Sequence, residues 1–310
     1  MVTALITHPA CLDHDAGAWH PERPDRLRVV LAALEDEAFS PLLREQAPEA
    51  TREQLLRAHP ATHVDAILSI RPEPGELVQL DADTAMNHAS AEAALRAAGG
   101  AALAVDAVMD GWVRTAFVAT RPPGHHAAPR RAMGFCLFNN AAVAAFEARA
   151  RWGLRRVAVV DFDVHHGNGT QAIFWNDPEL FYASSHQSPC YPGTGSPAER
   201  GVADNIVNAP LPPGADGAGF RRAWSQTILP ALDAFAPELL IISAGFDAHQ
   251  RDPLAQLRLE TEDFAWVTAE LLAAAGRHTS GRVVSLLEGG YDLDALAASA
   301  AAHVRVLTRT

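Results

Sequence analysis

Short apolar runs alternate along the chain with longer amphipathic segments. The apolar runs, rich in β-branched residues, predict strands over residues 3–8, 115–122, 156–164, 180–185, 238–246 and 282–290. Such continuous apolar strands are typical of a parallel sheet that is buried on both faces. Between them, apolar positions at helical spacing predict helices over residues 24–36, 90–110, 140–152, 219–235 and 262–277.

The alternation of strands and helices predicts an α/β fold, a doubly wound sheet with right-handed crossovers. No repeat, low-complexity tract or long linker divides the 310 residues, so we expect a single domain over residues 1–310. The longest segment rich in proline, glycine and serine is the loop 188–201. A long loop inside one domain is typical of a functional segment.

Composition and charge narrow the possible partners and location. The formal net charge is −12, so nucleic acid, which selects basic surfaces, is not an expected partner. The sequence has no run of 18 apolar residues, which disfavours a membrane-spanning helix. It shows no signal peptide, and its three cysteines, Cys11, Cys136 and Cys190, are too widely spaced to indicate a disulfide framework. We therefore expect a soluble, cytoplasmic protein.

Potential metal ligands follow the predicted strand at 156–164. Side chains two residues apart share a face in an extended chain, so Asp161, Asp163 and His165 would lie together while Phe162 and Val164 pack behind them. Carboxylates and an imidazole suit a divalent metal. The alternative for a single Asp-x-His, a capping aspartate beside a structural histidine, is weaker for three such residues on one face.

Further polar residues follow other predicted strands, and ligands of open α/β sheets bind beyond the carboxyl ends of strands. Asp247 in SAGFDAH is the natural third metal ligand, with His249 as its rival. Two carboxylates and one imidazole would leave coordination positions open, as in catalytic zinc sites. Tyr291 in EGGYD is either a donor to a substrate oxygen or a tyrosine buried in a turn.

The chain resembles the histone deacetylase and acetylpolyamine amidohydrolase superfamily in six segments, which together run from about residue 20 to residue 292: HPERPDR (20–26), RPPGHHA (121–127), DFDVHHGNG (161–169), YPGTG (191–195), SAGFDAH (243–249) and EGGY (288–291). Asn168 is similar to the class II branch and its bacterial relatives, where class I enzymes have aspartate. The resemblance implies an arginase-like fold with an eight-stranded parallel sheet. It also implies a Zn²⁺-dependent hydrolase that removes acetyl groups from amines, typically lysine side chains.

The resemblance also implies individual roles for the metal ligands and the two histidines. Asp163, His165 and Asp247 match the family's zinc ligands. His126 matches the general base that takes a proton from metal-bound water, and His125 matches its partner.

Three further residues complete the implied catalytic set. Asp161 would pair with His125 and favour its charged form, whereas the neutral Asn168 would orient His126 and leave it able to accept a proton. Tyr291 matches the tyrosine that polarises the acetyl carbonyl.

Substrate-binding residues and a second metal site are implied in the same way. Gly134, Phe135 and Tyr191 match the walls of the acyl-lysine channel, and Tyr191 replaces a common phenylalanine, so a more polar rim is expected. Arg26 matches an arginine of the internal cavity through which acetate is thought to leave. A structural K⁺ site is a weaker match, formed by Ser184 and Ser185 with Asp161 and the backbone that follows it.

The substrate is expected to be an acyl-lysine or another small N-acyl amine. Leu254 stands where one polyamine-specific branch has a glutamate that selects a cationic chain, so this way of recognising polyamines is disfavoured. Acetylpolyamines stay an alternative, because other loops could supply acidic residues, namely Asp13, Asp15, Asp81 and Asp83. An arginase-like binuclear manganese enzyme would share the fold but needs GGDHS and DAHxD segments that the sequence lacks. A non-catalytic acyl-lysine binding module is disfavoured by the complete residue set.

The remaining histidines have weaker assignments. His166 and His186 are expected beside the site, and His20 belongs to a loop at its entrance. The others are interpreted as surface or structural residues: His8, His14, His59, His63, His88, His278 and His303. Segments 9–26 and 188–201 could form a rim or a subunit contact, so a homo-oligomer stays open.

Overall fold

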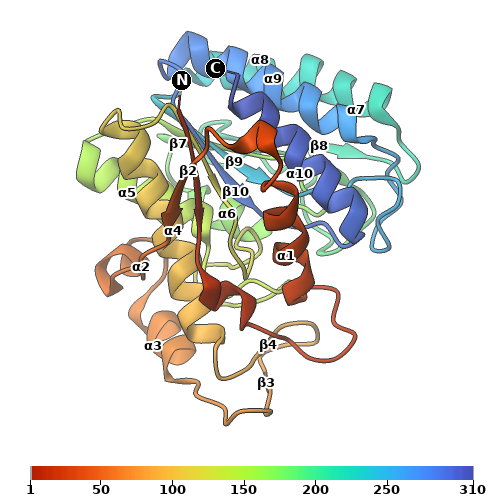
Figure 1. The fold of residues 1–310 in the computed structure, drawn as a ribbon. Helices are drawn as coiled ribbons and strands as arrows, with labels where there is room; N and C mark the ends of the chain where they lie inside the picture. The colour runs from red at the N-terminus through yellow and green to blue at the C-terminus, as the bar shows by residue number, and fades with distance from the viewer. Residues whose placement is uncertain (1, 310) are drawn as a thin grey trace.

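Eight strands form one sheet at the centre of the computed structural model, which describes residues 2–309 (Figure 1). Their spatial order is β2-β1-β5-β10-β9-β6-β7-β8, and every neighbouring pair is parallel. The bounds are β1 (Thr3–Thr7), β2 (Leu43–Gln46), β5 (Thr115–Val118), β6 (Val157–Asp161), β7 (Leu180–Gln187), β8 (Ile206–Leu211), β9 (Leu239–Ala244) and β10 (Val283–Leu287). The expected eight-stranded parallel sheet is confirmed.

Within this eight-stranded sheet, the two strands that the sequence pattern did not predict are its two edges. β2 alternates half-buried and exposed residues, because its side chains point alternately to a face packed on the core, as for Leu43, and to an exposed face. β8 contains Asn208 and Pro210, and proline is tolerated at a sheet edge, where a missing N–H leaves no broken ladder. Both strands therefore lack the continuous apolar run that identifies the inner strands.

Helices cover both faces of the sheet, as expected. One hydrophobic core lies under α2 (Arg52–Ala58), α3 (Ala61–Ser69), α4 (Ser90–Met109), α5 (Asn140–Trp152) and α6 (Asn168–Phe174). A second core lies under α1 (Pro24–Ala33), α7 (Gly217–Ala223), a π-helical turn (Trp224–Ile228), α8 (Leu229–Phe235), α9 (Thr261–His278) and α10 (Leu293–Leu307). Alternate residues of each inner strand face the two cores, so Val157 and Val159 point to one and Ala158 and Val160 to the other.

The remaining regular elements are short. They are two 3₁₀ turns, Pro9–Leu12 and Glu37–Phe39, and a small hairpin of β3 (Val78–Gln79) and β4 (Ala85–Met86). The five predicted helices are present, with the segment 219–235 divided by the π-helical turn. The prediction did not include the short helices α2, α3 and α6, nor α10, whose alanine-rich sequence has few charged residues to mark an outer face.

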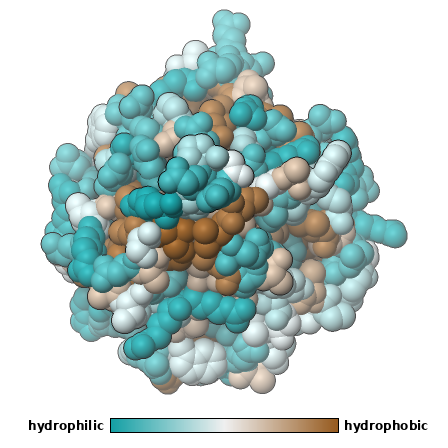
Figure 2. All heavy atoms as spheres, turned by 90° about the horizontal axis from the view of Figure 1, so that it is seen from below, coloured by the Kyte–Doolittle hydropathy of each residue, from teal (hydrophilic) through white to brown (hydrophobic). Residues whose placement is uncertain are grey.

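The carboxyl ends of the parallel strands meet at one edge of the sheet, at the lower side of Figure 1. Figure 2 shows the molecule from that side: apolar side chains gather near the centre of the face, within a surround of polar ones. The segments that carry the predicted ligands follow β6 and β9, and the tandem histidines follow β5. Parallel pairing therefore brings these distant segments together.

Candidate active site

Three buried side chains form a cluster with the geometry of a metal site. One ligand atom from each of Asp163, His165 and Asp247 lies within 4.8 Å of the others. His165 Nδ1 is 3.1 Å from Asp163 Oδ1 and 3.2 Å from Asp247 Oδ2. The rival ligand His249 lies outside this cluster, and its Nδ1 accepts the backbone N–H of Arg251 at 3.2 Å.

The chemistry of this cluster fits a divalent cation. Within residues 2–309, neither aspartate has an arginine or lysine partner, although buried carboxylates require compensation. Burial, with the charge of Asp163, raises the pKa of Asp247 to about 7. Burial would also raise the pKa of Asp163, but the positive charges of His125 and His165 hold it below its ordinary value. Two oxygens and one nitrogen with room for more ligands match a catalytic zinc site.

Two glycines allow the backbone to approach these carboxylates. A Cβ atom on Gly245 would lie 2.1 Å from Asp163 Oδ2, and one on Gly289 would lie 2.1 Å from Asp247 Oδ2. Any side chain at these positions would displace a ligand oxygen. The backbone N–H of Gly289 also donates to Asp163 Oδ2 at 2.8 Å, which orients that carboxylate.

The tandem histidines have different partners, as the sequence led us to expect. His125 Nδ1 lies 2.9 Å from Asp161 Oδ2, and His126 Nδ1 lies 2.8 Å from Asn168 Oδ1. The two ring centroids are 4.0 Å apart. The hydroxyl of Tyr182, a residue that the sequence did not single out, also donates to Asp161 Oδ2, at 3.0 Å.

These partners separate the protonation states of the two rings. Burial alone would lower the pKa of His125, but the carboxylates of Asp161 and Asp163 raise it to about 10. Burial also lowers the pKa of His126, and the positive charges of His125 and His165 lower it further. These shifts favour the charged form of His125 and the neutral form of His126.

A cavity of about 230 Å³ opens onto this cluster. It is lined by Asp83, His126, Gly134, Phe135, His165, Tyr191, Leu254 and Tyr291. The three expected channel residues, Gly134, Phe135 and Tyr191, are in this set, and so is Leu254. Asp83, one of the four loop acids, joins them: its carboxylate accepts the backbone N–H of Gly134 at 3.2 Å.

Arg26 and Asp252 contact the ring and the backbone of Tyr291, and its hydroxyl stays free to donate to a ligand. The guanidinium of Arg26 lies 4.8 Å from the ring centroid, and the backbone N–H of Tyr291 donates to Asp252 Oδ2 at 2.7 Å. No residue between 2 and 309 offers the phenol a hydrogen bond. Burial raises the pKa of the phenol well above 10, although Arg26 opposes the shift, so the hydroxyl keeps its proton.

Arg26 does not line the 230 Å³ cavity. It is fully buried, pairs with Glu22 at 2.9 Å, and donates to the carbonyl oxygens of Gly290 at 2.6 Å and Glu288 at 2.5 Å. Glu22 also accepts from Arg121 at 2.7 Å, so one buried carboxylate ties the start of the RPPGHH turn to α1.

The residues suggested for K⁺ are brought together only in part. Asp161 and Ser184 are register partners on β6 and β7, and the Ser184 hydroxyl lies 2.9 Å from His186 Nδ1. The hydroxyl of Ser185 accepts the indole N–H of Trp224 at 2.9 Å, on the opposite face of β7. Ser185 could therefore reach an ion beside Asp161 through its backbone carbonyl, whereas its hydroxyl points away.

His166 and His186 adjoin the site without entering it. His166 contacts the hydroxyl of Thr194 at 2.7 Å, and His186 Nε2 contacts the carbonyl of Gly195 at 3.0 Å. Their rings lie 4.8 Å apart. The pair thus fixes the YPGTG loop that carries Tyr191.

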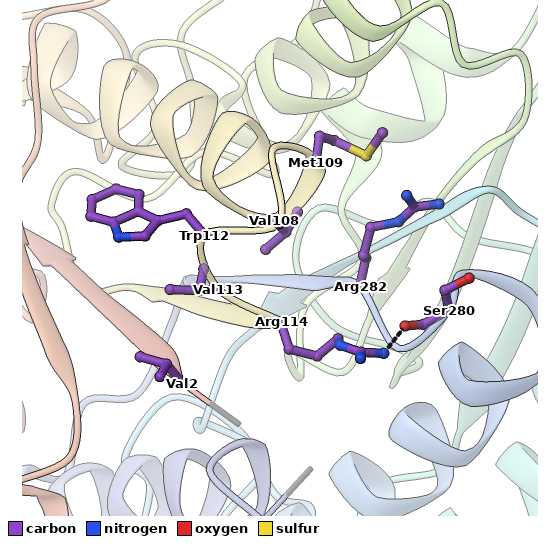
Figure 3. Close-up of a pocket in the computed structure, with 9 residues that line it drawn as sticks. Val2, Val108, Met109, Trp112, Val113, Arg114, Ser280 and Arg282 are labelled. Carbon is purple, nitrogen blue, oxygen red and sulfur yellow. Dashed lines mark hydrogen bonds between the residues drawn. The ribbon is translucent and has the colours of Figure 1, made fainter.

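A larger cavity, of about 380 Å³, lies at the opposite edge of the sheet, where β5 and β10 begin (Figure 3). Its lining includes Trp112, Arg114 and Arg282, and the Arg114 guanidinium donates to the carbonyl of Ser280. It contains no aspartate, glutamate or histidine and none of the predicted site residues. The smaller cavity is therefore the one that the predicted site residues line. In the described part of the chain no helix is both long and apolar enough for a membrane span.

Comparison with known proteins agrees with this geometry. The family model described as the histone deacetylase domain matches residues 20–307. A histone deacetylase-like amidohydrolase of Pseudomonas aeruginosa is 42% identical over 89% of this chain and 73% of its own. A probable deacetylase of Archaeoglobus fulgidus is 37% identical over 95% of this chain and 82% of its own.

The solved structures support the same assignment. The crystal structure of the HDA15 HD domain superimposes with a TM-score of 0.92 at 38% identity, over 99% of this chain and 89% of that one. The match to the family model, the sequence identity to these relatives and the common fold agree with one another. The chain belongs to the histone deacetylase family and is an amidohydrolase of the deacetylase type.

Proposed function

We propose that the protein is a zinc-dependent deacetylase that hydrolyses the amide of an acyl-lysine or another small N-acyl amine. The observation that carries the proposal is the shared cavity, which is lined by His165 of the three-ligand cluster, by His126 and by Tyr291. Asp163, His165 and Asp247 would hold Zn²⁺, on which the family generally depends. When bound, Zn²⁺ supplies acidified water and polarises the acyl carbonyl.

His126 is the proton acceptor in this proposal. Asn168 Oδ1 accepts from His126 Nδ1, so Nδ1 carries the proton and Nε2 keeps its lone pair. Because the neighbouring His125 is charged, the neutral form of His126 is favoured. Once protonated, His126 can return the proton to the amine that leaves.

Tyr291 is the oxyanion donor. Its hydroxyl faces the cavity with no competing partner within residues 2–309, and a donor that is already oriented has little reorganisation to make when charge develops. The guanidinium of Arg26 packs against the ring of Tyr291.

The cavity lining favours a chain that is apolar along its length. At about 230 Å³ the space is small, below the roughly 300–1,000 Å³ typical of pockets for drug-sized ligands. Phe135, Leu254 and Tyr191 would contact the methylene stem of an acyl-lysine. Acetylpolyamine is the second candidate, because Asp83 also lines the cavity and could attract a second cationic amine.

Other features stay predictions. A structural K⁺ beside Asp161 and Ser184 is a secondary proposal, with Ser185 contributing its carbonyl. A cytoplasmic location, the lack of a nucleic-acid partner and a possible homo-oligomer rest on sequence reasoning.

The test is a turnover panel on zinc-loaded enzyme, comparing acetyl-lysine peptides, acetylpolyamines and longer acyl-lysines. We expect acyl-lysine to have the highest kcat/KM. Tyr291→Phe should lower kcat by about 10²-fold or more, as removal of an oxyanion donor does elsewhere. Acyl-lysine binding without turnover would indicate a binding module instead, and two manganese ions per chain with urea release from arginine would indicate an arginase-like enzyme.

A further inference from the structure

Glu288 lies where three segments of the site meet. Its side chain is 1% exposed. Oε2 accepts the backbone N–H groups of Gly124 at 2.7 Å and His125 at 3.2 Å, and Oε1 accepts the hydroxyl of Ser243 at 3.0 Å. One carboxylate therefore joins the turn with the tandem histidines, the strand that leads to Asp247, and the segment that contains Tyr291.

The sheet order explains why this position can make all three contacts. β10 lies between β5 and β9. Glu288 directly follows β10, so its side chain reaches the turn after β5 on one side and Ser243 of β9 on the other.

Glu288 is held by hydrogen bonds rather than by an ion pair. Among residues 2–309 it has no salt-bridge partner, and Arg26 reaches only its backbone carbonyl. The charged groups that act on it are His125, Asp161 and Asp163. A buried carboxylate whose only direct partners are two N–H groups and one hydroxyl defines the position of those donors closely.

We propose that Glu288 is a positioning residue: its carboxylate fixes the Gly124–His125 backbone relative to β9 and so holds the histidine pair in register with Asp247 and Tyr291. The inference rests on the proposed deacetylase function. Glu288 does not line the cavity, so it acts through the groups that do.

A pair of conservative substitutions separates geometry from charge. In Glu288→Gln, the amide oxygen can accept both backbone N–H groups while its NH₂ donates to the Ser243 hydroxyl, which can also act as an acceptor. The two backbone donors select this orientation, so Glu288→Gln keeps the contacts and removes only the negative charge. Glu288→Leu, which is of similar size, offers no acceptor to either N–H group or to the Ser243 hydroxyl.

The measurements are kcat and KM for an acetyl-lysine peptide and the hydrogen-exchange rates of the Gly124 and His125 amides, all on zinc-loaded protein. Glu288→Gln should lose less than about 10-fold in kcat, at or below the range for outer partners of a metal site. Glu288→Leu should lose about 10²-fold, as expected for misplacement by about 1 Å, with KM changed only a few-fold. Its Gly124 and His125 amides should exchange faster than those of Glu288→Gln.

Ser285→Ala is the matched control, because Ser285 is a buried serine of β10 whose hydroxyl contacts His303 at 2.8 Å. It should leave kcat and both exchange rates unchanged. The inference is overturned if Glu288→Leu keeps the wild-type kcat and exchange rates, if Glu288→Gln is as impaired as Glu288→Leu, or if the control is impaired equally. Should wild-type protein show no deacetylase turnover, the proposed function fails, while the exchange rates still decide the role of Glu288.

Discussion

Gly289→Ala tests the metal cluster at the point where the backbone comes nearest to it. The added Cβ would lie 2.1 Å from Asp247 Oδ2 and 2.6 Å from Asp163 Oδ2, whereas ordinary contacts begin near 3.4 Å. The backbone has little freedom to retreat, because the N–H of Gly289 donates to Asp163 Oδ2 at 2.8 Å. The two ligand oxygens must therefore move instead.

The size of the effect follows from these distances. Relieving the contacts requires a shift of about 1 Å in one or both carboxylates, and a misplacement of that size costs on the order of 10²-fold in rate. Metal affinity should fall as well, because the two oxygens would no longer converge with His165 Nδ1 on one point. We expect lower zinc occupancy at limiting metal and a kcat reduced by about 10²-fold at saturating metal.

The assay measures zinc content by mass spectrometry after equilibration with a competing chelator, and turnover of an acetyl-lysine peptide. Gly276→Ala is the control: Gly276 lies inside α9, and a Cβ there would have no atom within 4 Å. This variant should keep full activity and gain about 0.5–1 kcal/mol in unfolding free energy, because alanine favours helix over glycine. Wild-type zinc affinity and wild-type kcat in Gly289→Ala would refute the assignment of Asp163 and Asp247 as ligands.

Three further predictions follow from the same structure. His126→Ala should abolish turnover while His125→Ala leaves measurable activity; the reverse order in kcat measurements would mean that the two roles are exchanged. Removal of metal by dialysis against a chelator should abolish turnover and added Zn²⁺ should restore it, so equal rates before and after dialysis would contradict zinc dependence. His303 is buried between the hydroxyls of Thr268, at 2.6 Å, and Ser285, at 2.8 Å, and burial lowers its pKa to about 3. Below pH 6.5 the unfolded chain therefore takes up a proton that the folded protein excludes, so stability is lost as pH falls from 6.5 toward 3, by up to about 1.4 kcal/mol per pH unit. In denaturant titrations at several pH values, His303→Gln should show a smaller loss, and an unchanged slope would contradict this explanation.

The inner part of the fold was predictable because burial on both faces leaves a clear pattern. Strands such as β6 and β9 are almost wholly apolar, and the polar residues that follow them stand out for that reason. The edge strands β2 and β8 were not predictable in this way, because a strand with one neighbour and partial exposure has no continuous apolar run. The residues of the metal cluster and the tandem histidines were predictable from their types, their spacing and the family resemblance.

The contacts that hold the residues around the site could be learned only from the tertiary structure. Ser185 stands beside Ser184 in the sequence, yet its hydroxyl faces Trp224 because successive strand residues point to opposite faces. Arg26 donates to the carbonyls of Glu288 and Gly290 and does not line the 230 Å³ cavity, while its place in an internal cavity stays a prediction. Both outcomes follow from the direction in which a side chain points, which spacing along the chain does not specify across elements.

The sequence by itself therefore determined the fold class, the residues of the candidate site and the family of reactions, because periodicity and residue chemistry are local properties of the chain. Only the tertiary structure decided which partner each residue has. Glu288 shows the difference most clearly: its contacts with Gly124 and Ser243 exist because β10 pairs between β5 and β9. Strand order and register, which arise from packing of the whole chain, set those distances.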